Sequence, residues 1–233
     1  MPGRLGRLLF IGVVAVCAVP GLAGAQDATP EPVATPDFTV TEAATITCEG
    51  EDAPKPALGY VIDPAQSMLR YRVREELMSI GATTAVGETS SVIGQFIFDA
   101  EGNPLPCSQI AVDLRTLKSD SSRRDGYLYN NTLESETYPL AIFVLSEVEG
   151  LDGPMPEGEE VDITLIGNFT VHGVTKLVRW QTTATLEDGV ITGTAVTQFE
   201  MPDFGITPPK VGPVLGLSET VQLEAEIVAK TTE

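Results

Sequence analysis

His172 is the only histidine in the 233-residue sequence, and it lies in the stretch GNFTVHGVTKLVRW, residues 167–180. A histidine acts as a general base when a nucleophile or a water lies within about 3 Å and a carboxylate orients its ring. The sequence has no G-x-S-x-G motif to supply a serine and no second imidazole to share a metal. Apolar residues flank His172 at every second position and Gly173 follows it. We therefore expect a hairpin corner at His172-Gly173, and we predict a non-enzyme with no catalytic residue, metal site or cofactor.

Cys48 and Cys107 are the two cysteines outside the N-terminal apolar run. Their spacing matches neither a metal site nor a C-x-x-C redox motif. An even pair in an exported protein favours a disulfide. Such a bond would close a loop of about 60 residues and stabilise the fold by roughly 4 kcal/mol. Two free, buried thiols are the alternative.

Residues 1–25 have the order of a secretory signal peptide: a basic start, an apolar run and an A-x-A site that ends at Ala25. The run is shorter than the roughly 20 residues that span a bilayer. Lipid anchoring at Cys17 is the less favoured alternative, because Val16 before it is larger than the small residue such a site takes. We expect export to the periplasm or the medium after cleavage near Ala25, without direct membrane insertion afterwards.

The predicted cleavage removes two arginines and no acidic residue, which takes the net charge from −19 to −21. Such a surface repels phosphate backbones and anionic lipid headgroups, so we exclude nucleic-acid binding and electrostatic adhesion to membranes. Residues 26–58 are rich in Pro, Thr, Ala and Glu and predict a largely disordered tether. A folded domain is expected over residues 59–230.

The folded domain shows an alternation of apolar and polar residues with period two, which is typical of half-buried strands. Eight segments have this pattern: residues 67–77, 90–103, 108–117, 140–150, 160–171, 173–189, 190–201 and 219–230. Residues 117–139 differ, since their Ser and Asp caps predict one or two short helices in a crossover. Eight such antiparallel strands suit a closed barrel or a two-sheet sandwich, and the pattern alone does not decide between them. A sandwich would be an extracellular interaction module that binds a protein or a glycan through its loops.

Six segments in register resemble the YceI-like lipid/polyisoprenoid-binding family over about Gly59 to Ala229. They are YVIDPAQSMLRYRV, VIGQFIF, IAVDLRTL running on to RRDGYL, YPLAIF, GNFTVHGVTKLV and FEMPDFGI. One departure is Gln66-Ser67, where the family commonly has His-Ser. The resemblance implies an all-β fold, an eight-stranded antiparallel lipocalin-like barrel with the short helices in its crossover. It also implies a non-catalytic role, holding a long isoprenoid or other long-chain lipid in an apolar interior.

The strand pattern identifies the side chains that would line such an interior. The predicted lining is Leu69, Tyr71, Val73, Phe96, Phe98, Val112, Leu114, Phe143, Leu165, Phe169, Trp180 and Phe199. A barrel filled by its own side chains would show the same alternation, so the sequence leaves open whether a cavity exists. Arg123 and Arg124 in the crossover are candidate contacts for a lipid headgroup, with helix capping and ion pairing as the alternative. The ligand's headgroup and the oligomeric state are also left open.

Overall fold

The computed structural model describes Cys48 and residues 56–79, 81–210 and 214–232. These residues all belong to the compact unit Pro32–Glu233. The predicted signal peptide, Cys17 and most of the predicted tether lie outside the described residues. The first strand begins at Leu58, which is the last residue of the predicted tether.

Eleven strands account for most of the described chain, and neighbouring strands are antiparallel throughout. They are β1 (Leu58–Ile62), β2 (Met68–Leu77), β3 (Gly81–Thr89), β4 (Val92–Phe98), β5 (Gln109–Asp113), β6 (Lys118–Ser119), β7 (Leu140–Glu149), β8 (Glu160–Val171), β9 (Val174–Glu187), β10 (Val190–Glu200) and β11 (Val214–Thr231). The short helices of the described connections are η1 (Leu114–Thr116), α1 (Ser122–Tyr127), η2 (Leu128–Thr132) and η3 (Met201–Phe204). None of the helices in these ranges is long and apolar enough to cross a membrane.

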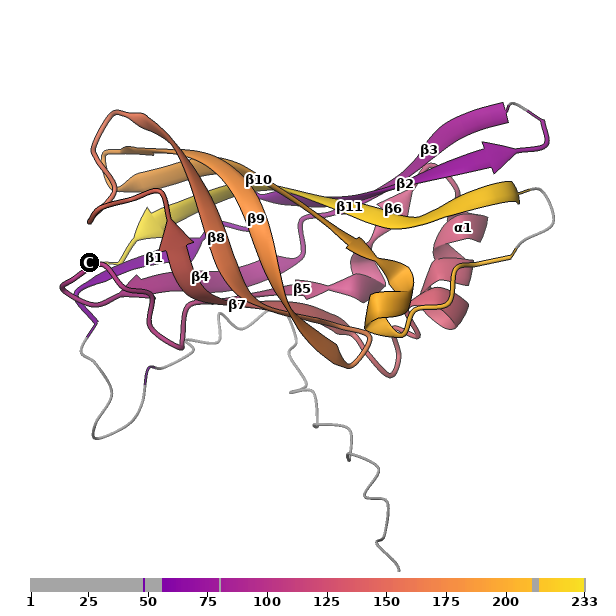
Figure 1. The fold of residues 1–233 in the computed structure, drawn as a ribbon, viewed down its shortest axis with the longest axis horizontal. Coiled ribbons are helices and arrows are strands. Elements are labelled where there is room, and N and C mark those ends of the chain that lie inside the picture. Colours follow the sequence, from indigo (N-terminus) through magenta and orange to yellow (C-terminus); the bar gives the residue numbers. More distant parts are fainter. Residues whose placement is uncertain (1–47, 49–55, 80, 211–213, 233) are drawn as a thin grey trace, which may run out of the picture. The chain divides into compact units, whose positions relative to one another are not determined.

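β1 lies between β4 and β11, and this position closes eight strands into a ring, in the order β1-β4-β5-β7-β8-β9-β10-β11. Tyr60 of β1 pairs with Phe96 on one side and with Thr231 on the other. A closed ring hides the apolar faces and the strand edges at once. Figure 1 shows the resulting single curved wall. The predicted eight-stranded antiparallel barrel is confirmed, and the two-sheet sandwich is wrong.

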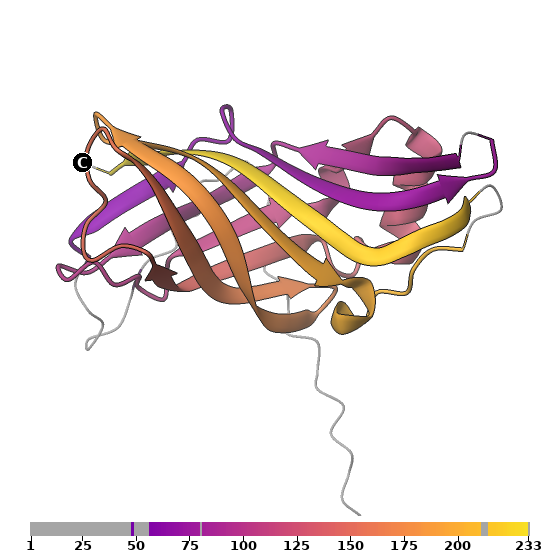
Figure 2. The same ribbon diagram turned by 45° about the horizontal axis from the view of Figure 1, so that its top comes forward.

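Seven of the eight ring strands are predicted from the sequence, but the eighth place belongs to β1 rather than β2. β11 is 18 residues long, so one of its edges binds β1 near the C-terminal end and β2 along the rest. β2 continues into β3 and β6, which extend the sheet beyond the ring (Figure 2). β1, β3 and β6 are absent from the predicted strands. β1 and β6 have only five and two residues, and β3, GATTAVGET, has few apolar ones.

The crossover between β5 and β7 contains α1 and η2, in agreement with the short helices predicted for residues 117–139. The Ser121 side chain caps α1 by accepting a hydrogen bond from the Arg124 backbone N–H. The Asp125 carboxylate accepts two more hydrogen bonds, from the backbone N–H (3.0 Å) and the hydroxyl (2.6 Å) of Ser119. These bonds hold α1 against β6, next to the extension formed by β2 and β3 (Figures 1 and 2).

His172 and Gly173 form the whole turn between β8 and β9. Their φ angles are 53° and 73°, and positive values at both positions define the type I′ hairpin turn. The His172 ring packs against the crossover, with its centroid 4.7 Å from that of Tyr138 and its Nε2 3.6 Å from a carboxylate oxygen of Glu134. The predicted hairpin corner is confirmed.

Candidate ligand-binding cavity

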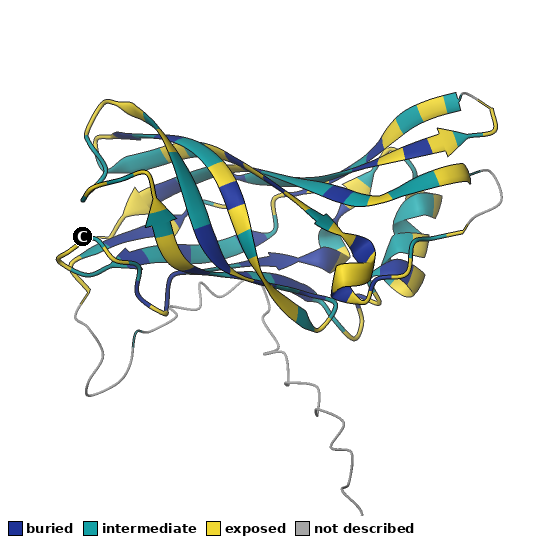
Figure 3. Ribbon diagram, viewed as in Figure 1, coloured by how far each residue is buried: buried dark blue, intermediate teal, exposed yellow. Residues whose placement is uncertain are grey.

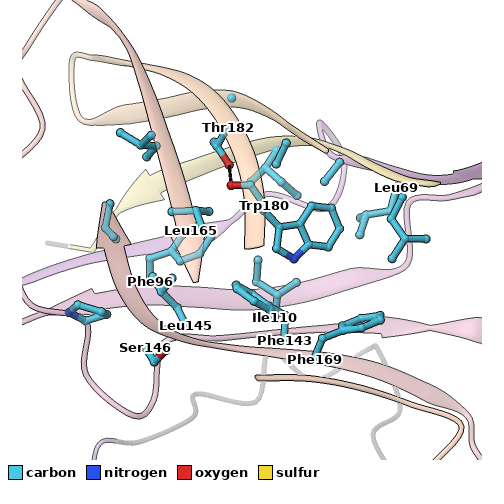
Figure 4. Close-up of a pocket in the computed structure, with 18 of the residues that line it drawn as sticks. Leu69, Phe96, Ile110, Phe143, Leu145, Ser146, Leu165, Phe169, Trp180 and Thr182 are labelled. Carbon is cyan, nitrogen blue, oxygen red and sulfur yellow. Dashed lines mark hydrogen bonds between the residues drawn. The ribbon is translucent and has the colours of Figure 1, made fainter. Parts of the chain in front are cut away.

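The barrel encloses a cavity of about 620 Å³, so its interior is hollow rather than filled by its own side chains. All the side chains predicted to face inward line it: Leu69, Tyr71, Val73, Phe96, Phe98, Val112, Leu114, Phe143, Leu165, Phe169, Trp180 and Phe199. The period of two places them there, and the strands alternate accordingly between more and less buried residues (Figure 3). Figure 4 shows lining side chains from different strands facing one another across the cavity, among them Trp180 of β9 and Phe143 of β7. Their contact with a ligand stays a prediction.

A band of small residues on three adjacent strands explains why the interior stays open. Ala184 of β9 pairs with Gly193 of β10, and Ala195 of β10 pairs with Ala225 of β11. All four residues line the cavity. The strands on the other side of the ring, β4 and β7, contribute phenylalanine side chains. Side-chain volume is therefore missing from one part of the wall, and the interior is not filled to the density of an ordinary core.

Residues outside the predicted inward-facing set complete the lining. The crossover and the loop after β10 contribute Leu117, Leu128, Thr132, Leu133, Met201 and Ile206. The loops that follow β4 and β7 contribute residues 99–104, Leu151 and residues 153–155, and β1 contributes Leu58 and Tyr60. These residues are absent from the predicted lining because loops and very short strands show no alternation that could mark an inward face.

The charged residues of the lining are mostly acidic: Arg70, Asp99, Glu101, Glu147 and Glu224. The Arg70 guanidinium already pairs with Glu88 at 3.0 Å and with Glu226 at 2.5 Å. The side chain of Asn103 donates a hydrogen bond that lowers the pKa of Asp99 below its ordinary value, so this carboxylate stays ionised at neutral pH. A lining with this balance of charge repels an anionic headgroup.

Arg123 and Arg124, the candidate headgroup contacts, lie outside the cavity lining that the described residues form. Arg124 pairs with Glu75 of β2 at 3.0 Å and with Asp120 just before α1. Arg123 is exposed on α1. Their positions do not support a headgroup role, because the charge of Arg124 is neutralised by structural ion pairs and Arg123 faces solvent. The alternative fits Arg124 better, since its side chain forms ion pairs and its backbone N–H donates to the capping side chain of Ser121.

Tyr71 lines the cavity beside the Arg124 ion pair. Its ring packs over Gly87 of β3, where a Cβ atom would lie 2.3 Å from the tyrosine ring. Burial raises the pKa of Tyr71 to about 12. The phenol therefore stays neutral at physiological pH and contributes a polar but uncharged group to the wall.

Two buried side-chain polar atoms have no hydrogen-bond partner among the described residues: Trp180 Nε1 and Thr132 Oγ1. Trp180 is 7% exposed and Thr132 is 5% exposed, and both line the cavity. The Trp180 indole projects from β9 into the cavity (Figure 4) and stands edge-on to Phe143, with ring centroids 6.1 Å apart. Buried polar atoms in folded proteins are nearly always paired, so these two atoms stand out in an otherwise apolar wall.

The cysteine pair lies apart from the cavity. Cys48 and Cys107 form a disulfide with their Cα atoms 5.3 Å apart. Cys107 packs with Ile97 and Leu105 in a small cluster separate from the main core. In the described part of the chain, no group of three or more His, Cys, Asp or Glu side chains is placed to hold a metal ion.

Comparison with known sequences places residues 60–229 in register with the model of the YceI-like domain. A UPF0312 protein of Shewanella sp. (strain ANA-3) is 31% identical over 161 residues, which make up 64% of this chain and 78% of that protein. A UPF0312 protein of Shewanella sp. (strain MR-7) matches with the same identity and coverage.

Two solved structures share the fold. A polyisoprenoid binding domain from Saccharophagus degradans, implicated in plant cell wall breakdown, superposes with a TM-score of 0.61 at 16% identity, over 76% of this chain and 100% of its own. BcnA of Burkholderia cenocepacia superposes with a TM-score of 0.55 at 20% identity, over 72% of this chain and 99% of its own. At such identities the likeness extends to the fold alone.

Proposed function

Because this chain belongs to the YceI-like domain family, we propose that it is an exported, non-catalytic binding protein for a long isoprenoid or similar amphiphilic lipid. The observation that carries the proposal is the cavity of about 620 Å³ inside the closed barrel. The described side chains that line it are mainly aliphatic and aromatic, and this size is ordinary for a ligand site. The structural neighbour from S. degradans is itself a polyisoprenoid binding domain.

The driving force of binding is the burial of hydrocarbon. Each methylene group that leaves water contributes about 0.8 kcal/mol. Association and the ordering of a flexible chain oppose this gain with roughly 4–15 kcal/mol. A chain of several isoprene units therefore binds tightly only where most of it is enclosed. A closed ring of eight strands provides such an enclosure.

A non-catalytic role is supported by where the reactive side chains lie. His172 is fixed in a hairpin turn and packs on Tyr138 and Glu134, and it does not contribute to the described lining. The carboxylates of the lining have no imidazole beside them that would form a nucleophile and base pair. Binding and release, rather than a reaction, are what this arrangement of groups supports.

Export is proposed from residues 1–25, whose basic start, apolar run and A-x-A site match a secretory leader. The mature chain would begin at Gln26, with residues 26–58 as a tether before the barrel domain. N-terminal sequencing of the protein isolated from the periplasm or the medium tests this proposal. A chain that stays in the cytoplasm with its leader intact would contradict it.

A matched pair of substitutions on β10 tests the binding function. Ala195 faces the cavity and is 9% exposed, whereas its neighbour Val196 faces outward and is 37% exposed. Ala195→Phe should fill part of the cavity and abolish most lipid retention, and Val196→Phe should retain it. The measurement is mass spectrometry of lipid released by solvent from each purified protein, with circular dichroism to check the fold. Equal retention by the two folded variants, or no lipid in the wild type, would reject the proposed function.

A further inference from the structure

Trp180 presents a hydrogen-bond donor to the middle of the barrel. The residue lies halfway along β9, pairs with Leu165 of β8 and is 7% exposed. Its Nε1–H has no acceptor among the described residues. The hydroxyl of Thr182, the next inward-facing residue of β9, donates instead to the Trp180 carbonyl oxygen at 3.3 Å. The indole N–H is therefore a donor without a described acceptor, held in a mainly apolar wall (Figure 4).

An unpaired buried donor destabilises a protein relative to a paired one, because the loss of its hydrogen bond to water is not compensated. A phenylalanine at position 180 would supply a similar aromatic surface without that penalty. The packing of Trp180 on Phe143 does not use the indole nitrogen as a donor to any described residue. An acceptor atom on a bound molecule would remove the penalty, and the apolar surroundings would strengthen the resulting bond.

The charge of the lining restricts what kind of acceptor can enter. The lining residues Asp99, Glu101 and Glu147 carry negative charge. Glu224 pairs with Arg72 at 2.7 Å, and the one arginine of the described lining, Arg70, is engaged by two glutamates outside it. A phosphate or carboxylate group in the cavity would lie in the field of these carboxylates, and the described lining offers no free cation to neutralise it. A neutral oxygen acceptor meets neither obstacle.

We propose that Trp180 Nε1–H donates a hydrogen bond to a neutral carbonyl oxygen of the bound lipid. The preferred occupant is then a carbonyl-bearing isoprenoid amphiphile, not a plain hydrocarbon or an anionic lipid. The position of Trp180 along β9 implies that the carbonyl group lies inside the barrel rather than at its rim. This inference rests on the proposed lipid-binding function and adds the chemistry of the group that is recognised.

The test uses two probes of the same length: farnesylacetone, an isoprenoid ketone, and the analogue in which a methylene group replaces its carbonyl. The delipidated full-length mature protein is titrated with each probe, and native mass spectrometry confirms binding. Trp180 is the only tryptophan of the sequence, so a ¹⁵N-labelled sample gives one indole N–H cross-peak. That peak should move downfield with farnesylacetone and should not do so with the hydrocarbon.

Substitution supplies the second measurement, the ratio of the dissociation constants of the two probes. Trp180→Phe should reduce the preference for the ketone by about fivefold, the ordinary value of one neutral hydrogen bond. Phe169→Leu, which alters another lining residue without removing a donor, should leave the ratio unchanged. The indole N–H spectra of the wild-type protein with the two probes test the inference even if a variant does not fold.

The outcomes are distinct. A selective shift of the indole peak together with a lower ratio in Trp180→Phe supports the inference. If both probes bind but the indole peak responds equally to them, or the ratio is unchanged in Trp180→Phe, the inference fails and the lipid-binding function stands. If neither probe binds the delipidated protein, both the inference and the proposed function are rejected.

Discussion

Arg124 of α1 and Glu75 of β2 are 49 residues apart in the sequence and form an ion pair of 3.0 Å, in which the Glu75 side chain is only 5% exposed. This pair joins the crossover to the sheet extension at one end of the barrel. A buried carboxylate that loses its partner is left without compensation, and this destabilises a protein more than the loss of an exposed pair.

Arg124→Met should therefore lower the free energy of unfolding by about 2–4 kcal/mol, because it leaves the Glu75 charge buried and unpaired. Arg123→Met, one residue earlier on α1 and exposed, should change it by less than about 0.5 kcal/mol. Urea denaturation of the two variants measures the difference. Equal stability of the two variants would contradict the structural role assigned to Arg124, and neither change should reduce lipid retention.

A side chain at Gly173 should destabilise the β8–β9 turn. A Cβ atom there would lie 2.8 Å from the Tyr138 ring, and the φ angle of 73° disfavours alanine in addition. Gly158 has the same φ of 73°, but among the described atoms nothing lies within 4 Å of its Cβ position. Gly158→Ala should destabilise the fold by about 1 kcal/mol, and Gly173→Ala should destabilise it more. Thermal unfolding of both variants checks this order, and the reverse order would refute it.

Tyr71 should make the fold sensitive to alkaline pH. Its pKa is raised from 10.0 to about 12 by burial, so the folded state binds the phenolic proton more tightly than the unfolded state. Stability is then fully retained below pH 10 and falls as the pH rises towards 12, by at most about 2–3 kcal/mol. Unfolding measured at pH 9 and above should show a smaller loss for Tyr71→Phe than for the wild type. Tyr127→Phe, at a residue 36% exposed, should behave like the wild type, and an equal loss in all three proteins would exclude this role for Tyr71.

The disulfide between Cys48 and Cys107 should support stability without affecting binding. It joins two cysteines that are 59 residues apart in the sequence. Removal of such a cross-link ordinarily lowers the free energy of unfolding by about 2–4 kcal/mol. A Cys48→Ser, Cys107→Ser double variant should unfold at a lower urea concentration and bind farnesylacetone as the wild type does, since neither cysteine lines the cavity. A wild type that unfolds identically with and without reductant would show that the bond is absent or of no consequence.

The acidic lining should discriminate against anionic lipids. Glu101 and Glu147 are exposed at the cavity, so replacing both with glutamine removes negative charge without disturbing the core. Binding of farnesyl phosphate should strengthen severalfold at low ionic strength and the gain should shrink as salt is added. Glu187→Gln, at an exposed position outside the described lining, is the control. The same gain for the neutral ketone would show that charge is not the cause.

The features of this protein that depend on local periodicity could be predicted from the sequence. In a strand, successive side chains point to opposite faces, so alternation identified the inward-facing set from Leu69 to Phe199. Gly173 predicted the turn between β8 and β9. The two strand patterns are separated by only two residues, and a turn of that length needs positive φ angles, which glycine adopts readily. The order of the six segments predicted a known family, and the match of residues 60–229 to the YceI-like domain confirmed it.

Tertiary structure alone decided the features that require distant segments to meet. Closure of the ring depends on β1 and β11, whose pairing joins the two ends of the domain. Neither segment has a sequence feature that identifies the other as its partner. The cavity exists because small residues of β9, β10 and β11 become neighbours. The pattern along one strand does not show how much side-chain volume several strands together place in the interior. The partner of Arg124 and the unpaired N–H of Trp180 were hidden for the same reason, since hydrogen-bond partners are set by proximity in space.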